Sequence, residues 1–287
     1  MSLHPAHENP ASTPSTLVAR DGENIAVQDW PLAQEAPQRG LVLIVHGLGE
    51  HAGRYDTVAR GLNDWGFAVR GYDQYGHGRS GGPRGGLTSA QRLLDDLGDV
   101  VDDTRTQMPP TAPLILLGHS LGGLVAAQLV AQQIRPVSAL VLSSPALDAG
   151  LTPVQKALLA VLPKIVPNLR IGNGLNPRYL SHDPVVVAAY KADKQVHDRI
   201  SARLALFIAE GGPAVIQQAA HWTTPTLLLY AGADKLVNPL GSRAFAAAAP
   251  RAVVTAQCFD ALYHEIFNEL DYGPVLQALQ NWLDARF

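Results

Sequence analysis

An apolar run of strand length ends abruptly in a glycine-flanked serine, and this junction constrains the fold more than any other part of the chain. Residues 114–117 lead into Gly-His-Ser-Leu-Gly-Gly (residues 118–123), and a helix-favouring stretch, residues 124–133, follows. A serine on such a tight strand-to-helix turn is held in a strained backbone conformation, with its Oγ exposed above the sheet. The flanking glycines are needed because a Cβ there would collide with the neighbouring strand and helix. Ser120 is therefore a candidate nucleophile for acyl transfer.

The same pattern occurs a second time in a different context. Residues 78–82 also read Gly-x-Ser-x-Gly, but they lie in a glycine-rich run, residues 76–86, that also holds Pro83. No strand leads directly into this run and no helix leaves it. We therefore interpret it as a loop and Ser80 as noncatalytic.

Strand and helix patterns alternate along most of the chain. An opening hairpin is indicated by two strand-like segments, residues 17–20 and 24–30, around an Asp-Gly turn. Apolar runs of strand length then alternate with segments whose apolar residues recur at helical spacing. The expected strands are residues 41–45, 67–69, 114–117, 137–142, 226–230 and 253–258, and the expected helices are 55–66, 89–107, 124–133, 240–248 and 275–283. This order predicts an α/β fold, with a mostly parallel central sheet, an antiparallel N-terminal edge and helices on both faces.

Two parts of the chain depart from this alternation. Residues 1–16 are rich in Pro, Ser, His and Ala, lack the apolar core of a secretory signal, and are expected to form a disordered N-terminal tail. Residues from about 146 to 222 are too many for a connecting loop and hold helix-like pieces, 154–161 and 198–209. We interpret this insertion as a helical cap over the carboxyl edge of the sheet, where open α/β sheets bind ligands. Residues 17–287 would then form one domain that includes the cap.

A serine nucleophile needs a general base, and the base needs an acid that orients it. In a fold with this strand–serine–helix turn, the acid and then the histidine follow the serine along the chain. His264 is the histidine after Ser120 that follows a core strand, so it is the expected base. Asp234, at the carboxyl end of the preceding strand, is the favoured acid. Asp260, which shares the strand connection of His264, is the alternative.

The chemistry also needs backbone N–H groups that bind an oxyanion. One is expected from Leu121, the residue after the nucleophile, and one from the loop after an earlier strand. His-Gly-Leu-Gly (residues 46–49) directly follows the strand 41–45, which makes the Leu48 N–H the expected second donor. The sequence has no metal-site spacing of His, Cys and Asp and no phosphate-binding glycine loop, so no metal or cofactor is expected.

Composition excludes several classes of protein. An apolar share of 47% and a charged share of 16% over 287 residues describe a globular chain with a substantial core. A formal net charge of −3 without a basic cluster gives no support to nucleic-acid binding. The single cysteine, Cys258, excludes an internal disulfide framework and fits a reducing compartment. No uncharged apolar stretch reaches ~18 residues, so we expect no transmembrane helix and a cytoplasmic location.

With these pieces placed, the chain resembles the α/β-hydrolase superfamily over residues 17–287. Within it, the chain is similar to monoglyceride lipases and bacterial lysophospholipase-like serine hydrolases. Five segments in order carry the resemblance: residues 46–55, 71–80, 118–123, 232–234 and 264–269. The pattern Gly-Glu-His-x-Gly-Arg-Tyr in residues 49–55 narrows the resemblance to this branch.

The resemblance implies a serine hydrolase that cleaves the carboxylic ester of a monoacylglycerol-like lipid through an acyl-enzyme. Ser120, Asp234 and His264 would form its catalytic triad, and Leu48 and Leu121 its oxyanion hole. Lysophospholipase, short-chain carboxylesterase and aminopeptidase activities are alternatives, and a noncatalytic receptor or scaffold is an alternative from another class. The expected partner is a small lipid or ester, with no nucleic acid, and the oligomeric state stays open.

Two polar residues of the resemblance have two readings. Glu50 and Arg54 would help shape the polar end that receives a glycerol head group, or they would form an ion pair that anchors their loop. Related monoglyceride lipases can carry a histidine three residues after the catalytic one, where this chain has Phe267. That difference leaves hydrolysis intact and bears on glycerol recognition.

Apolar residues of the cap also have more than one reading. They could wall an acyl-chain tunnel, make a transient contact with a membrane surface, or pack onto the sheet. The residues concerned are Leu158, Leu159, Val161, Leu162, Ile165 and Val166.

Overall fold

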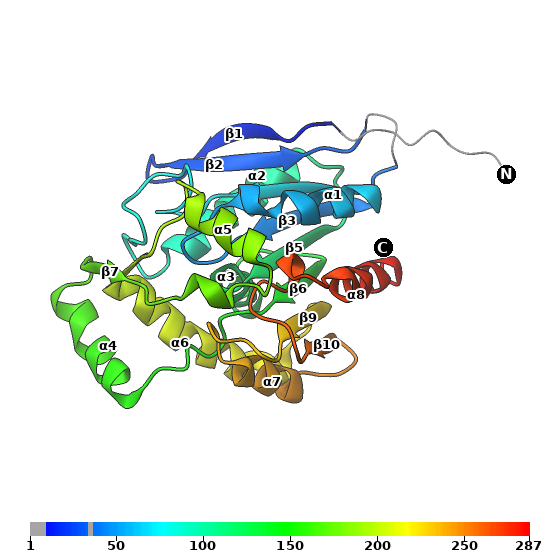
Figure 1. Ribbon diagram of the computed structural model, residues 1–287. Helices are drawn as coiled ribbons and strands as arrows, with labels where there is room; N and C mark the ends of the chain where they lie inside the picture. Colours follow the sequence, from blue (N-terminus) through cyan, green and yellow to red (C-terminus); the bar gives the residue numbers. More distant parts are fainter. Residues whose placement is uncertain (1–9, 34–36) are drawn as a thin grey trace.

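The computed structural model describes residues 10–33 and 37–287, which form an eight-stranded main sheet in the order β1-β2-β4-β3-β5-β6-β9-β10 (Figure 1). Its strands are β1 (Thr13–Val18), β2 (Asn24–Trp30), β3 (Gly40–Val45), β4 (Phe67–Tyr72), β5 (Leu114–His119), β6 (Ala139–Ser143), β9 (Thr226–Ala231) and β10 (Val254–Phe259). The β1–β2 and β2–β4 pairs are antiparallel, and the pairs from β4 to β10 are parallel. The predicted sheet, mostly parallel with an antiparallel N-terminal edge, is confirmed.

The central strands are apolar on both faces, as buried parallel strands should be. In β3, Leu41, Leu43 and Val45 belong to one apolar core, and Val42 and Ile44 belong to another. Successive side chains point to opposite faces of a strand, so one continuous apolar run supplies both cores. β3 and β5 are the fourth and fifth strands of the sheet. The loops that follow them therefore emerge at its centre.

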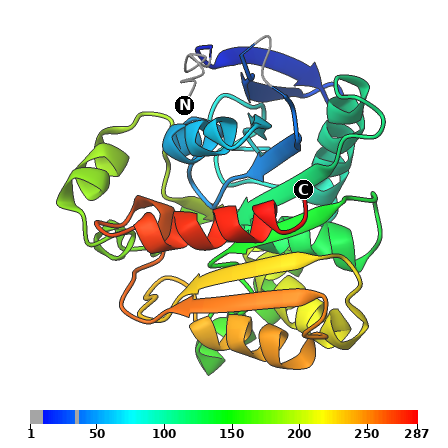
Figure 2. The same cartoon turned by 90° about the vertical axis from the view of Figure 1, so that its right-hand side faces the viewer.

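Helices cover both faces of the sheet. α1 (Asp56–Asp64) and α8 (Gly273–Asp284) contribute to one core, and Figure 2 shows them, in blue and red, on the same side of the sheet. α2 (Arg92–Thr106), α3 (Leu121–Ala131) and α7 (Pro239–Ala248) contribute to the core on the other face. No helix within the described residues combines the length and the apolarity that crossing a bilayer requires.

The segment between β6 and β9, which we call the cap, is an insertion into the alternating pattern. It contains α4 (Pro153–Ile165), β7 (Arg170–Gly172), η2 (Pro177–Tyr179), α5 (Pro184–Ala192), β8 (Arg199–Ser201), α6 (Ala202–Gln218) and η3 (Ala219–His221). β7 and β8 pair as a small antiparallel sheet. Backbone hydrogen bonds of 2.8–2.9 Å join the cap to loops that follow core strands, between His197 and Gly49, Ser201 and Gly85, and Leu180 and Glu265. The cap therefore lies against the carboxyl edge of the sheet.

Some boundaries differ from the sequence prediction. Residues 13–16, which were expected to belong to the disordered tail, are part of β1 and pair with residues 26–29 of β2, so the tail prediction is wrong there. Residues 1–9 lie outside the described residues. β1 is an exposed edge strand, and such a strand needs no apolar alternation to form.

The cap differs as well. Residues 199–201, expected to begin a helix, form β8, and α5 was not predicted. Pro184 stands at the first position of α5, after the N-cap Asp183, where proline favours helix initiation.

Candidate active site

β5 ends at His119, directly before Ser120, and α3 begins at Leu121. Ser120 has φ 52° and ψ −117°, a conformation that residues other than glycine rarely adopt. Three backbone hydrogen bonds hold it there. Its N–H donates to the Ser143 carbonyl at 3.0 Å, and its carbonyl accepts from the N–H groups of Leu124 at 3.1 Å and Ala146 at 3.0 Å. The first N–H groups of a helix have no acceptor inside it and carry partial positive charge. The Leu121 N–H is thus available beside Ser120 to an anionic oxygen.

Ser120 lines a cavity of about 450 Å³ between the sheet and the cap. Leu48, Leu121 and His264 line the same cavity. Many of its other side chains are apolar, including Leu151, Leu159, Leu175, Ile200, Ile208, Leu236 and Val237. A largely apolar cavity of this size suits a small ligand with an apolar chain.

His264 is paired with the predicted acid. Its Nδ1 lies 2.6 Å from Asp234 Oδ2, whereas the alternative, Asp260, contacts Cys258 Sγ at 3.2 Å. With Nδ1 facing Asp234, Nε2 is the ring nitrogen left for proton transfer. No hydrogen bond between the described side chains joins Ser120 Oγ to His264. Both line one cavity, and hydrogen bonds of this kind often tighten only in the substrate complex.

Asp234 and His264 shift each other's pKa. Burial would raise the pKa of Asp234, but the charge and hydrogen bond of His264 outweigh burial, and the pKa is lowered. Burial would lower the pKa of His264, but Asp234, with the nearby carboxylate of Glu265, outweighs it and the pKa is raised. The ring of His119 lies 4.7 Å from that of His264 and stays neutral, because burial and the charge of His264 lower its pKa to about 4. The site therefore holds an ionised acid beside an imidazole of enhanced basicity, which suits a general base.

The loop after β3 fixes the orientation of one peptide unit. His46 Nε2 accepts the Gln74 N–H at 2.9 Å, so the proton of this buried, neutral ring is on Nδ1, which donates to the Gly47 carbonyl at 2.8 Å. The Gly47–Leu48 peptide is trans, so its N–H points opposite to its carbonyl. Holding the Gly47 carbonyl on His46 therefore turns the Leu48 N–H away from His46. Leu48 lines the cavity with Ser120, which fits the expected oxyanion donor.

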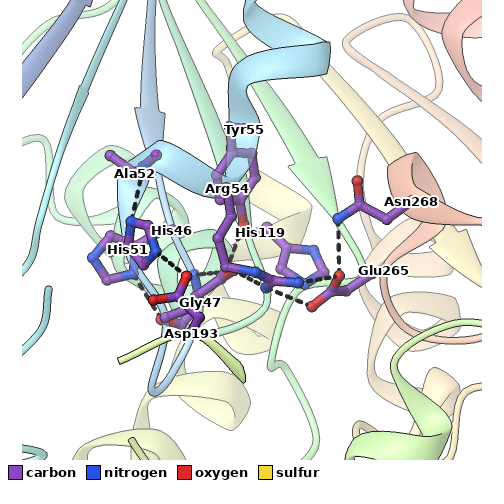
Figure 3. Close-up of polar contacts among 12 residues, drawn as sticks. His46, Gly47, His51, Ala52, Arg54, Tyr55, His119, Asp193, Glu265 and Asn268 are labelled. Atoms are coloured by element: carbon purple, nitrogen blue, oxygen red, sulfur yellow. Dashed lines mark hydrogen bonds and ion pairs between the residues drawn. The ribbon is translucent and has the colours of Figure 1, made fainter. Parts of the chain in front are cut away.

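Glu50 belongs to this loop and Arg54 to the short helix η1 (Ala52–Tyr55) that follows it, and neither lines the cavity. Figure 3 shows the Arg54 side chain extending from near Tyr55 toward Glu265. Glu50 Oε1 accepts the Gly47 N–H at 2.5 Å and the Tyr55 hydroxyl at 2.7 Å, and Oε2 pairs with Arg54. Burial would raise the pKa of Glu50, but the charge of Arg54 outweighs it and lowers that pKa to about 2. Of the two readings of this pair, the geometry matches the buried ion pair that anchors the loop.

Two carboxylates that sequence analysis did not single out hold the loop after β10. Glu265 binds Arg54 through both oxygens, at 2.7 and 2.8 Å. Glu269 accepts the Tyr263 N–H at 2.6 Å and the His182 N–H of the cap at 2.9 Å. Both residues lie in the segment 264–269 that carried part of the resemblance. Their partners are distant in sequence, so spacing alone could not identify these contacts.

Other candidate features of the sequence form no second site. Ser80 is buried in a loop, where its Oγ accepts the Ala26 N–H at 2.8 Å and donates to the Asp73 carbonyl at 2.5 Å. Its hydroxyl is thus used within the fold, in agreement with the noncatalytic interpretation. Across residues 10–33 and 37–287, no three His, Cys, Asp or Glu side chains gather so as to hold a metal ion.

Known proteins match this chain over most of its length. The Hydrolase_4 family model, described as serine aminopeptidase, S33, matches residues 36–271. The chain is 37% identical to a monoacylglycerol lipase of Mycolicibacterium smegmatis, over 91% of this chain and 93% of that protein. It is 32% identical to the phospholipase YtpA of Bacillus subtilis, over 89% of this chain and 98% of that protein.

Solved structures also match this chain over most of its length. A monoacylglycerol lipase of Paleococcus ferrophilus superposes with a TM-score of 0.81 at 34% identity, covering 92% of this chain and 99% of that one. A soluble variant of the monoglyceride lipase of Saccharomyces cerevisiae, in complex with a substrate analogue, superposes with a TM-score of 0.87 at 22% identity, covering 99% of each chain. The second structure shares the fold.

Proposed function

The chain belongs to the Hydrolase_4 family (serine aminopeptidase, S33) and is a serine hydrolase of α/β-hydrolase fold, and from this premise we propose that it hydrolyses monoacylglycerols through an acyl-enzyme. The observation that carries the proposal is the pairing of His264 with Asp234 at a largely apolar cavity that Ser120 also lines. Relatives named monoacylglycerol lipase, matched over nearly their whole length, support the choice of substrate.

In the proposed mechanism, His264 Nε2 takes the Ser120 proton as Oγ attacks the ester carbonyl, and Asp234 holds the imidazole in the required tautomer. The oxyanion binds the N–H groups of Leu48 and Leu121. The C–O bond then breaks, and the alcohol leaves with the proton from His264. Water, deprotonated by His264, attacks the acyl-enzyme, which releases the fatty acid and returns the proton to Ser120.

The lining of the cavity favours an ester over a peptide with a free amine. None of the described residues that line the cavity is an aspartate or a glutamate. The lining does include a cationic residue, Lys235. A substrate ammonium group would lose hydration there without gaining a carboxylate partner. An acyl chain with a neutral alcohol has no such cost.

Lys235 also favours a second candidate. Its ammonium group could pair with a phosphate, so a lysophospholipid is the alternative substrate, in keeping with the similarity to a phospholipase.

We also propose that the cap contacts membranes transiently. Val154, Leu158, Val161 and Ile165 are between 50% and 71% exposed, and their spacing places them along one side of α4. Leu159 lines the cavity instead, so α4 would separate the lipid phase from the site. α4 packs on α6, and Figure 1 shows it at the outer edge of the molecule.

Such a contact would bring the enzyme to an insoluble substrate. A cytoplasmic location is part of this proposal, because the free thiol of Cys258 fits a reducing compartment.

The test is a panel of monoacylglycerols, lysophospholipids and p-nitrophenyl esters of graded chain length. We expect the highest kcat/KM on a monoacylglycerol and a loss of at least about 10³-fold in Ser120→Ala. Ser80→Ala is the matched control, because it alters a serine in the same Gly-x-Ser-x-Gly pattern and should stay active. Turnover of lysophospholipids alone would establish the second candidate. Equal rates for Ser120→Ala and the wild type would refute the serine mechanism.

A further inference from the structure

A buried arginine lies between the loop after β3 and the loop after β10. The proposed reaction requires these two loops to keep a fixed position relative to each other. Arg54, in η1 (Ala52–Tyr55), pairs with Glu50 of the loop after β3 and with both oxygens of Glu265, which follows His264. Figure 3 shows the guanidinium group reaching Glu265 from the side of Tyr55. The Arg54 side chain is 11% exposed, and those of Glu50 and Glu265 are 5% exposed. These charges therefore face one another rather than solvent.

Each carboxylate also binds the loop that it belongs to. Glu50 accepts the N–H of Gly47, whose carbonyl belongs to the peptide that carries the Leu48 N–H. Glu265 Oε2 accepts from Asn268 Nδ2 at 2.8 Å, within η4 (Ile266–Asn268). Polar contacts are therefore continuous from the expected oxyanion donor to the residue beside His264.

The arginine is also covered by the cap. Its guanidinium carbon lies 4.8 Å from the centre of the Tyr190 ring in α5. A planar guanidinium group can bind one carboxylate with two parallel hydrogen bonds, stack on an aromatic ring and pair with a second carboxylate. A lysine ammonium group cannot reproduce this arrangement.

We propose that Arg54 and Glu265 are positioning residues and that they do not bind the alcohol group of the substrate. They would hold the oxyanion loop (residues 46–51, after β3) in a fixed position relative to the histidine loop (residues 260–265, after β10). The inference rests on the proposed function, because this relative position matters only if both loops act on one ester. Displacement of a catalytic group by about 1 Å can cost 10²-fold in rate. Loss of the contact between Arg54 and Glu265, which we call the bridge, should therefore slow the hydrolysis of every ester by a similar factor.

The test compares Arg54→Lys and Glu265→Gln on three esters of one acyl chain, with glycerol, ethanol or p-nitrophenol as the alcohol. We expect kcat/KM to fall by about 10- to 100-fold, by the same factor for each ester, with KM nearly unchanged. Glu265→Gln leaves Arg54 paired with Glu50, so it keeps the buried charges balanced even if Arg54→Lys folds poorly.

Asp103→Asn is the matched control. Arg70 likewise joins two carboxylates, Asp29 and Asp103, at 2.6 and 2.7 Å, and none of the three lines the cavity. This variant should lower the melting temperature while keeping wild-type kcat/KM. A loss confined to the glycerol ester would overturn the inference, since it would assign Arg54 and Glu265 to alcohol binding. Wild-type rates in Glu265→Gln would overturn it as well.

Failure of the proposed function has a different signature. A wild type that cleaves the ethyl and p-nitrophenyl esters but not the glycerol ester would refute the monoacylglycerol proposal. The positioning role of Arg54 and Glu265 would then be tested by the fall in kcat/KM of their variants on the ethyl and p-nitrophenyl esters. Equal falls on both esters would support it, and wild-type rates in Glu265→Gln would overturn it.

Discussion

At the scale of single residues, the protonation of His264, the proposed general base, is expected to set the pH range of activity. Burial would lower its pKa, but Asp234 outweighs burial and raises the pKa above its ordinary value of about 6.5. Since only the neutral ring accepts the Ser120 proton, kcat/KM for a p-nitrophenyl ester should fall below a midpoint that lies above pH ~6.5. Asp234→Asn removes the opposing charge, so the midpoint should move to lower pH while the rate drops by about 10⁴-fold. A wild-type midpoint at or below ~6.5 would contradict this assignment.

His46 offers a second test at this scale. His46→Leu frees the Gly47 carbonyl and leaves the Gln74 N–H without its acceptor. Removal of one oxyanion donor costs about 10²–10³ in kcat, and a misdirected Leu48 N–H should approach that loss. Steady-state kinetics below the unfolding range measure kcat, with His221→Leu, an exposed histidine in η3, as the control. A less stable variant with wild-type kcat would show that His46 only supports the fold.

The same scale shows what the sequence can predict about the candidate site. Chain order led to the pairing of Asp234 with His264, because core strands fix where both loops emerge. It could not predict that Arg54 binds Glu265, since these residues are 211 positions apart and meet only when two loops fold together. A Glu-Arg pattern looks the same in sequence whether its charges face a ligand or each other.

At the scale of elements, the packing of α3 against β3 holds Ser120 beside the loop that carries the expected oxyanion donor, Leu48. A Cβ on Gly122 would overlap the carbonyl oxygens of Val45 and His46, which are backbone atoms and cannot swing aside. Gly122→Ala should therefore destabilise the protein by about 1–3 kcal/mol and reduce kcat, because the oxyanion loop must shift.

Gly61→Ala is the control for this substitution. Gly61 lies in α1 with open space around it, so alanine should stabilise the protein by about 0.4–1 kcal/mol with unchanged kcat. Urea unfolding measures both free energies. Equal stabilities for the two variants would contradict the packing argument.

Elements also differ in how well the sequence predicts them. β3, β5 and β9 are buried on both faces, so their sequences are almost wholly apolar and their positions were predicted within a residue or two. The cap elements have exposed or half-exposed faces and lack that signal. β8 is three residues long and pairs only with β7 among the described strands, so its formation depends on tertiary contacts that local sequence does not encode.

At the scale of the whole molecule, the site lies between two layers held together by hydrogen bonds and ion pairs. The sheet supplies Ser120 and His264, and the cap supplies the roof of the cavity. His51 Nε2 lies 2.8 Å from Asp193 of the cap, and the His182 ring stacks on Tyr263, with 3.6 Å between centres. These contacts fix the cap beside the expected catalytic loops and leave the outer side of α4 uncovered.

The proposed binding of a lipid surface can be tested by substitutions on the uncovered side of α4. Burial of a Leu or Ile side chain contributes about 1.5–3 kcal/mol, so Leu158→Asp with Ile165→Asp should weaken binding to phosphatidylcholine vesicles by about two orders of magnitude. Neither residue lines the cavity, so kcat/KM on a water-soluble p-nitrophenyl ester should stay at the wild-type value while turnover of vesicle-borne monoacylglycerol falls. Val18→Asp is the control, because Val18 is 61% exposed on β1, on the opposite side of the molecule from α4 in Figure 1. Vesicle co-sedimentation measures binding directly, and equal binding of the wild type and the α4 variant would remove the membrane role of the cap.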